Sequence, residues 1–167
     1  MDILPEFCQK RILILGCGNT LFGDDGFGPE VVSYLLHNYE VPNHVCIMDV
    51  GTGVRKVLFT LALSETRPEE IVVIDAVDWG GQPGEVFEIP IEAIPKQKVD
   101  NFSMHQAPTS NLLQELREQC GVRVTVLACD VGPVPSMVQP GLSEAVREAV
   151  PVACHKIVEK YFNVRNI

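Results

Sequence analysis

The sequence predicts an α/β protein: a three-layer sandwich with a mostly parallel five-stranded sheet, one antiparallel edge strand and helices on both faces. Three observations predict this architecture. Several short apolar runs are continuous rather than alternating, which is typical of strands covered on both faces. Helical patterns separate most of these runs. The resulting order β-α-β-α-β-β-α-β-α is typical of parallel strands joined by helical crossovers.

Five segments are predicted as strands. The apolar runs at residues 11–15, 71–74 and 122–127 are the clearest, and residues 45–48 form a shorter run. Residues 85–89 alternate in polarity after the turn sequence GGQPG. Such alternation indicates a strand with one solvated face, so this segment is predicted to be the antiparallel edge strand.

Four helices are predicted between and after these strands. The first follows Gly28, and the second spans Val54–Leu63, where apolar residues recur at helical spacing. Pro108 opens the third helix, and Ser143 caps the fourth. Pro151 interrupts the apolar pattern of the fourth helix, so we expect a kink or a split at this position.

Length and composition indicate one acidic globular domain over residues 1–167, with residues 1–10 as a short N-terminal extension. The formal net charge of −9 argues against nucleic acid as the main partner, because phosphate binding requires basic clusters. No apolar run approaches the roughly 20 residues of a membrane span, and no signal peptide is recognisable. The six cysteines include no CxxC pair, so we expect free thiols in a cytoplasmic protein.

The segment LGCGNTLFGDDGFGPEVV links the first strand to the first helix. A dinucleotide-binding fingerprint would need glycine at positions 16, 18 and 21, but position 21 is leucine. Asp24 and Asp25 also place negative charge where a helix N-terminus would otherwise attract a phosphate. The loop is therefore predicted to present carboxylates. Capping of the helix is a sufficient explanation for Asp24, whereas Asp25 is a candidate site residue.

Two further candidates lie elsewhere in the chain. Asp75 directly follows the apolar run IVVI and is predicted to end its strand, where ligands gather in open α/β sheets. His105, in NFSMHQAPTS, precedes the third helix. Together with the loop aspartate they are a plausible ligand set for nickel, copper, iron or zinc, although a turn aspartate and a structural histidine are the ordinary explanations. Three more aspartates near strand ends are candidate supporting groups: Asp49, Asp78 and Asp130.

The motifs GCGNTLFGDDGFG, DVGTG, VVIDAVDWGGQPGEV, SMHQ and GLSEAV occur in this order. Together they resemble those of the [NiFe]-hydrogenase maturation endopeptidases, over residues 11–158. The details LFGDDGFGP, PGEVF and SMHQAP are most similar to the branch that serves coenzyme F420-reducing hydrogenases of methanogens. Some members have Glu in place of Asp25, and many continue the histidine motif as H-Q-x-G, where this chain has HQAP.

The resemblance implies a hydrolase that makes a single cut. It would remove the C-terminal extension of a [NiFe]-hydrogenase large-subunit precursor, of the F420-reducing enzyme, after nickel insertion. The metal-contacting and catalytic positions of the family fall on Asp25, Asp75 and His105 here. These residues would recognise nickel that the substrate already holds, so no permanent cofactor is expected. An aspartate acting as general base, as in an aspartyl protease, and a metal-activated water remain alternatives.

Two other classes of function compete with this hypothesis. The chain is alternatively a non-catalytic module of Rossmann-like fold that senses a metal or binds a nucleotide. The missing third glycine and the adjacent aspartates count against nucleotide binding. A generic α/β hydrolase with a bound metal and a small substrate is the third possibility, on which the composition has no bearing.

Overall fold

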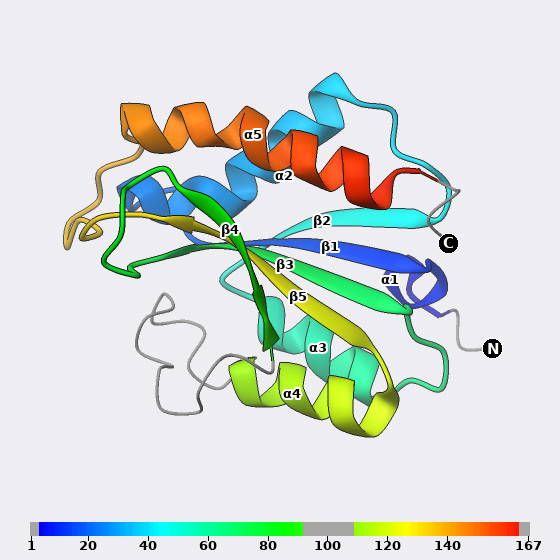
Figure 1. The fold of residues 1–167 in the computed structure, drawn as a ribbon. Coiled ribbons are helices and arrows are strands. Elements are labelled where there is room, and N and C mark those ends of the chain that lie inside the picture. Colours follow the sequence, from blue (N-terminus) through cyan, green and yellow to red (C-terminus); the bar gives the residue numbers. More distant parts are fainter. Residues whose placement is uncertain (1–3, 92–108, 164–167) are drawn as a thin grey trace.

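A computed structural model describes residues 4–91 and 109–163 of the chain. Its centre is a five-stranded sheet with the strand order β2-β1-β3-β5-β4 (Figure 1). β1 pairs in parallel with β2 and β3, β3 pairs in parallel with β5, and β4 runs antiparallel to β5 at one edge. The predicted fold class is therefore confirmed. The strands are β1 (Ile12–Cys17), β2 (Val45–Gly51), β3 (Glu70–Val77), β4 (Val86–Pro90) and β5 (Arg123–Asp130).

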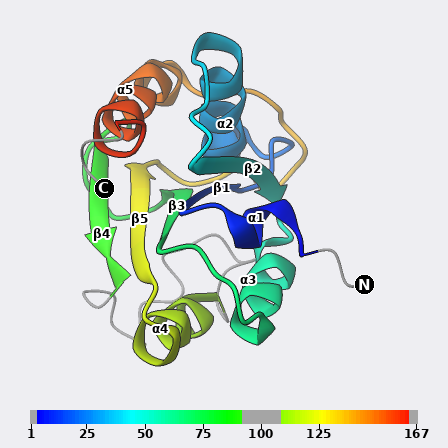
Figure 2. The ribbon, with the colours of Figure 1, turned by 90° about the vertical axis from the view of Figure 1, so that its right-hand side faces the viewer.

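Helices cover both faces of the sheet, with α2 and α5 on one face and α3 and α4 on the other (Figures 1 and 2). None of the helices in the described part of the chain is long and apolar enough to cross a membrane. The helical segments are α1 (Glu6–Gln9), the 3-10 turn η1 (Gly23–Gly26), α2 (Phe27–Asn38), α3 (Val54–Leu63), α4 (Thr109–Cys120) and α5 (Glu144–Tyr161).

The central strands send alternate side chains into two cores. Leu13 and Val73 lie in the core beneath α3 and α4, whereas Ile14 and Ile74 lie in the core beneath α2 and α5. Because both faces are covered, every position of these strands favours an apolar residue, which is why the runs are continuous in the sequence. The alternation also assigns the side chain of residue 75 to the α3/α4 face, together with that of residue 73.

The strands extend further than the apolar runs predicted. Asp75 was expected to end its strand, but it lies inside β3, where it pairs with Ala128, and the ladder continues to Val77 opposite Asp130. This prediction was wrong because ladder hydrogen bonds join backbone groups and do not require apolar side chains.

Of the kink or split expected at Pro151, the split is absent. α5 runs without interruption from Glu144 to Tyr161, with Pro151 in its interior. Its apolar face is anchored on both sides of the proline, since Val146 and Ile157 are fully buried. Packing of this face supplies the stability that offsets the backbone hydrogen bond lost at the proline.

None of the six cysteines forms a disulfide. Cys46 and Cys120 are partly exposed, and the other four are buried. Burial, and then the charge of Asp24, raise the pKa of the Cys129 thiol to about 12, and burial does the same for Cys154. These two side chains therefore act as small apolar groups of the core.

Candidate active site

Glycines bring the loop after β1 into direct contact with the sheet. A Cβ atom on Gly28 would lie 2.6 Å from the carbonyl oxygen of Ile74, and one on Gly16 would lie 2.5 Å from Cγ2 of Val32. Both distances are shorter than van der Waals contact, so the start of α2 reaches β1 and β3 only because these positions are glycine. Since Ile74 precedes Asp75, this close packing sets η1 and its Asp25 beside Asp75.

The two aspartates flank the point where the strand order reverses. The chain passes from β1 to β2 on one side and then crosses back to β3 on the other side of β1. In open α/β sheets, ligands bind beyond the carboxyl ends of the strands at this switch point. Asp25 follows β1 and Asp75 lies near the end of β3, so both stand at the expected place for a site.

Asp25 is held by the turn that contains it. Its side chain is only 4% exposed, and its Oδ2 accepts a hydrogen bond of 3.0 Å from the backbone N–H of Asn19. The side chain of Asn19 in turn accepts a 3.0 Å hydrogen bond from the backbone N–H of Leu21. Asn19 thus fixes the turn that orients Asp25. The sequence analysis did not single out Asn19; its place in the GCGN segment is the signal that could have indicated such a role.

Asp75 is the most deeply buried ionisable group of the described site. It is 0% exposed, and its Oδ1 accepts a 2.9 Å hydrogen bond from the backbone N–H of Ala76. Its Oδ2 has no hydrogen-bond partner in the described structure. Burial, and then the negative charge of Asp25, raise the pKa of Asp75 well above its ordinary value, against the lowering effect of the Ala76 hydrogen bond. Asp75 therefore keeps its proton to higher pH than an ordinary carboxyl group.

This pair of carboxyl groups has two chemical uses. A carboxyl group with a raised pKa can exchange a proton with a reacting group, and an oxygen without a partner can bind a cation. Residues 4–91 and 109–163 contain no cluster of three or more His, Cys, Asp and Glu side chains that would hold a metal ion. His105, the third predicted member of the site, lies outside the described residues.

Asp24 has a structural role, but not the predicted one. It does not cap α2. Its Oδ1 accepts a 2.7 Å hydrogen bond from the backbone N–H of Ser143, and its Oδ2 accepts a 2.9 Å hydrogen bond from the Ser143 hydroxyl. Ser143 is the N-cap residue of α5, so its hydroxyl binds Asp24 instead of the first turn of its own helix. Asp24 thereby ties the start of α5 to the loop that carries Asp25.

The three other aspartates near strand ends do not join the pair. Both oxygens of Asp130 accept hydrogen bonds, at 3.2 Å from the backbone N–H of Trp79 and at 2.7 Å from that of Gly81, so Asp130 fixes the loop after β3. Asp49 accepts a 2.9 Å hydrogen bond from the backbone N–H two residues further along the chain. Asp78 is exposed.

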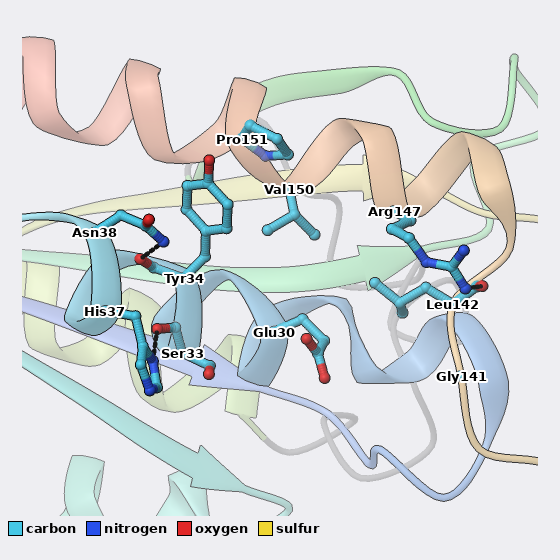
Figure 3. A pocket seen from close by; sticks show the side chains of 10 residues that line it. All are labelled: Glu30, Ser33, Tyr34, His37, Asn38, Gly141, Leu142, Arg147, Val150 and Pro151. Carbon is cyan, nitrogen blue, oxygen red and sulfur yellow. Dashed lines mark hydrogen bonds between the residues drawn. The ribbon is translucent and has the colours of Figure 1, made fainter.

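A groove of about 570 Å³ lies between α2 and α5, on the outer side of the helical layer (Figure 3). In this groove Arg147 donates a 2.9 Å hydrogen bond to the carbonyl oxygen of Leu142. Neither Asp25 nor Asp75 lines it, so the groove is separate from the carboxylate pair. The residues around it are Glu30, Ser33, Tyr34, His37, Asn38, Gly141, Leu142, Arg147, Val150 and Pro151.

Comparison with known proteins gives a consistent result. The family model described as hydrogenase maturation protease matches residues 29–160. A protein of Methanocaldococcus jannaschii assigned to the hydrogenase maturation proteases is 39% identical, over 90% of this chain and 96% of its own length. The coenzyme F420 hydrogenase subunit delta of Methanothermobacter thermautotrophicus is 36% identical, over 91% of this chain and 95% of its own length.

Solved structures agree with these sequence relatives. The hydrogenase maturating endopeptidase HybD of Escherichia coli superposes with a TM-score of 0.71 at 25% identity, over 89% of this chain and 90% of that one. The [NiFe] hydrogenase maturation protease HycI of Thermococcus kodakarensis gives a TM-score of 0.67 at 26% identity, over 90% and 92% of the two chains.

Proposed function

Because the chain belongs to the hydrogenase maturation protease family, we propose that it removes the C-terminal extension of a [NiFe]-hydrogenase large-subunit precursor after nickel insertion. The relative named as a coenzyme F420 hydrogenase subunit supports the precursor of an F420-reducing hydrogenase as the substrate. Six cysteines without a disulfide fit a reducing compartment such as the cytoplasm.

The cut is assigned to a site made by Asp25, Asp75 and His105. One observation carries this assignment: Asp75 is a fully buried carboxyl group whose Oδ2 has no hydrogen-bond partner among the described residues, and it lies next to a second buried aspartate. Such an arrangement costs stability, and perturbed carboxyl groups of this kind are concentrated at functional sites.

The position of α4 supports the inclusion of His105. α4 leads into the N-terminal end of β5, so the beginning of α4 lies toward the carboxyl edge of the sheet (Figure 1). His105 precedes Thr109 by four residues in the sequence. α4 also covers the sheet face to which the side chain of Asp75 is assigned by strand alternation.

Nickel belongs to the substrate in this proposal, and the enzyme only recognises it. Two carboxylates and one imidazole leave coordination positions for thiolates of the precursor. A site that is completed only by loaded precursor would bind the loaded form better than the empty one, and this difference makes nickel insertion a condition for cleavage. Among the described residues, Asp75 is suited to hold and transfer a proton, because burial and the charge of Asp25 raise its pKa above that of an ordinary carboxyl group.

The test is cleavage of a nickel-loaded precursor, followed by the mass of the product. Asp25→Asn, Asp75→Asn and His105→Ala should each lower the rate at least about 100-fold, in the range expected for loss of a group that exchanges a proton with the substrate. Asp49→Asn is the matched control, since it removes one exposed carboxylate at the same edge of the sheet and the amide oxygen can still accept the turn hydrogen bond. Wild-type rates in the three site variants would contradict the assignment.

A metal held by the enzyme itself is the alternative for the chemistry. Treatment of the enzyme with a chelator, followed by removal of the chelator, should leave cleavage of loaded precursor unchanged. Loss of activity, with recovery on added zinc and cleavage of nickel-free precursor, would instead identify a resident catalytic metal.

A further inference from the structure

Exposed apolar side chains gather on the loop between β5 and α5 and on the loop after β1. Val134, Met137 and Val138 are 42%, 78% and 64% exposed, and Leu21 is 48% exposed. These four residues form a surface that we call the apolar ridge, and they are among ten large apolar side chains that are exposed in the described part of the chain. A concentration of this kind marks an interaction surface more often than single exposed apolar residues do.

The ridge is one surface because backbone hydrogen bonds join its two loops. The N–H of Gly23 donates to the carbonyl oxygen of Gln139 at 2.8 Å, and the N–H of Gln139 donates to that of Leu21 at 2.8 Å. Pro135 packs against this bridge, since a Cβ atom on Gly23 would lie 3.0 Å from its Cδ. Hydrogen bonds and prolines hold the ridge in place before a partner arrives, which lowers the entropy that binding must overcome.

The composition of the ridge is that of an interface core. Residues 131–143 contain no charged side chain, although 21% of the whole chain is charged. Depletion of charge and enrichment of methionine distinguish the centres of protein interfaces from the rest of a protein surface. Met137, the most exposed of the four, can also adapt its flexible side chain to a partner.

The ridge is continuous with the carboxylate site. Its Leu21 lies on the turn that leads into Asp24 and Asp25 within four residues. Asp24 binds Ser143, at the far end of the loop between β5 and α5, so one short turn holds both this loop and the site residue. In Figure 1 this loop lies at the left end of the molecule, at the carboxyl ends of β1 and β5.

We propose that the apolar ridge is the docking surface for an apolar patch on the folded hydrogenase precursor. This inference rests on the proposed function, which requires a protein substrate to reach Asp25 and Asp75. A partner that reaches these two aspartates at the C-terminal ends of the strands would also cover the neighbouring apolar ridge. The enzyme would then recognise the folded surface of the precursor as well as the segment that it cuts.

The test compares cleavage kinetics of ridge variants that keep the carboxylate site intact. Met137→Glu and Val138→Glu should each raise KM for loaded precursor by about tenfold or more, with kcat within about twofold of wild type. Leu63→Glu is the matched control, because Leu63 is 86% exposed at the end of α3, toward the opposite edge of the sheet. Met137→Leu keeps the side chain apolar and should leave KM at the wild-type value.

Direct binding of the precursor to the same variants separates the two proposals. Weaker binding to the glutamate variants supports the ridge even if no cleavage is observed, in which case only the proposed function fails. An unchanged KM and affinity, or an equal effect of Leu63→Glu, would overturn the docking surface. A change in the sedimentation of the enzyme alone, without a change in KM, would show that the ridge binds a second copy of this chain instead.

Discussion

Replacing Asp75 by asparagine is expected to stabilise the protein while it inactivates the enzyme. In the folded state Asp75 is 0% exposed, and within residues 4–91 and 109–163 only its Oδ1 has a hydrogen-bond partner. Asp25 also repels its charge. Leaving a buried polar group unsatisfied costs about 1–3 kcal/mol, and more for a charged group. Asparagine keeps an oxygen for the Ala76 N–H and removes the charge. A gain of about 2 kcal/mol at neutral pH corresponds to a rise in Tm of roughly 4–8 °C for a chain of this size.

The sign of the pH dependence follows from the raised pKa of Asp75. Below the ordinary value of 3.8, the carboxyl group is protonated in both the folded and the unfolded chain, so its charge costs nothing. As the pH rises, the unfolded chain loses this proton first, and the stability contributed by the protonated folded form is lost until the pH passes the folded-state pKa. The advantage of Asp75→Asn over wild type should therefore be small near pH 3.8 and largest above the folded-state pKa.

Urea denaturation at the two ends of this pH range measures the effect, with Asp130→Asn as the matched control. Asp130 is also buried, at 2% exposure, but both of its oxygens accept backbone hydrogen bonds. Its replacement turns one acceptor into a donor that faces an N–H group, so we expect a loss of about 1–3 kcal/mol. If Asp75→Asn destabilises the protein as Asp130→Asn does, the buried charge of Asp75 is not a cost to stability and the expected gain is refuted.

Three further predictions concern the surroundings of the site. Gly28→Ala should cost about 1–3 kcal/mol in thermal unfolding, because its Cβ would lie 2.6 Å from a β3 carbonyl oxygen, whereas Gly132→Ala, with no atom within 4 Å of its Cβ, should be neutral. Asp24→Asn should cost roughly 1 kcal/mol and speed amide hydrogen exchange in the loop between β5 and α5; unchanged exchange would show that its bonds do not hold this loop. A thiol reagent at mildly alkaline pH should modify the two partly exposed cysteines of the folded protein and reach Cys129 and Cys154 only on unfolding, since burial raises the pKa of both to about 12.

Much of the fold could be predicted because a sheet that is buried on both faces requires continuous apolar runs in its strands. Continuous apolar runs indicated four strands, an alternating run indicated the edge strand, and helical spacing indicated α3 with its observed bounds. Strand ends could not be predicted in the same way. β1 continues through Gly16, and β3 continues through Asp75, because the ladder depends on neighbouring backbones that the local sequence does not reveal.

The candidate site was predictable only in part. Charge at a glycine-rich turn indicated Asp25, and an aspartate after an apolar run indicated Asp75. The bonds between Asp24 and Ser143, 119 residues apart, left no local pattern in the sequence. The complete burial of Asp75 also depends on layers that assemble from distant segments. Sequence patterns therefore indicated the candidate aspartates, whereas tertiary packing determines which of them have structural roles.

The adjacent aspartates show how packing divides two similar residues between two tasks. Both oxygens of Asp24 are satisfied by Ser143, so its charge holds the loop between β5 and α5. Asp25, one residue further, is turned inward and raises the pKa of Asp75. A chain selected for stability alone would replace one member of this buried pair, because removing either charge relieves the repulsion. A role in binding a cation or transferring a proton would explain why the chain keeps this repulsion. The turn that carries Asp25 also carries Leu21, so it connects the carboxylate site to the apolar ridge.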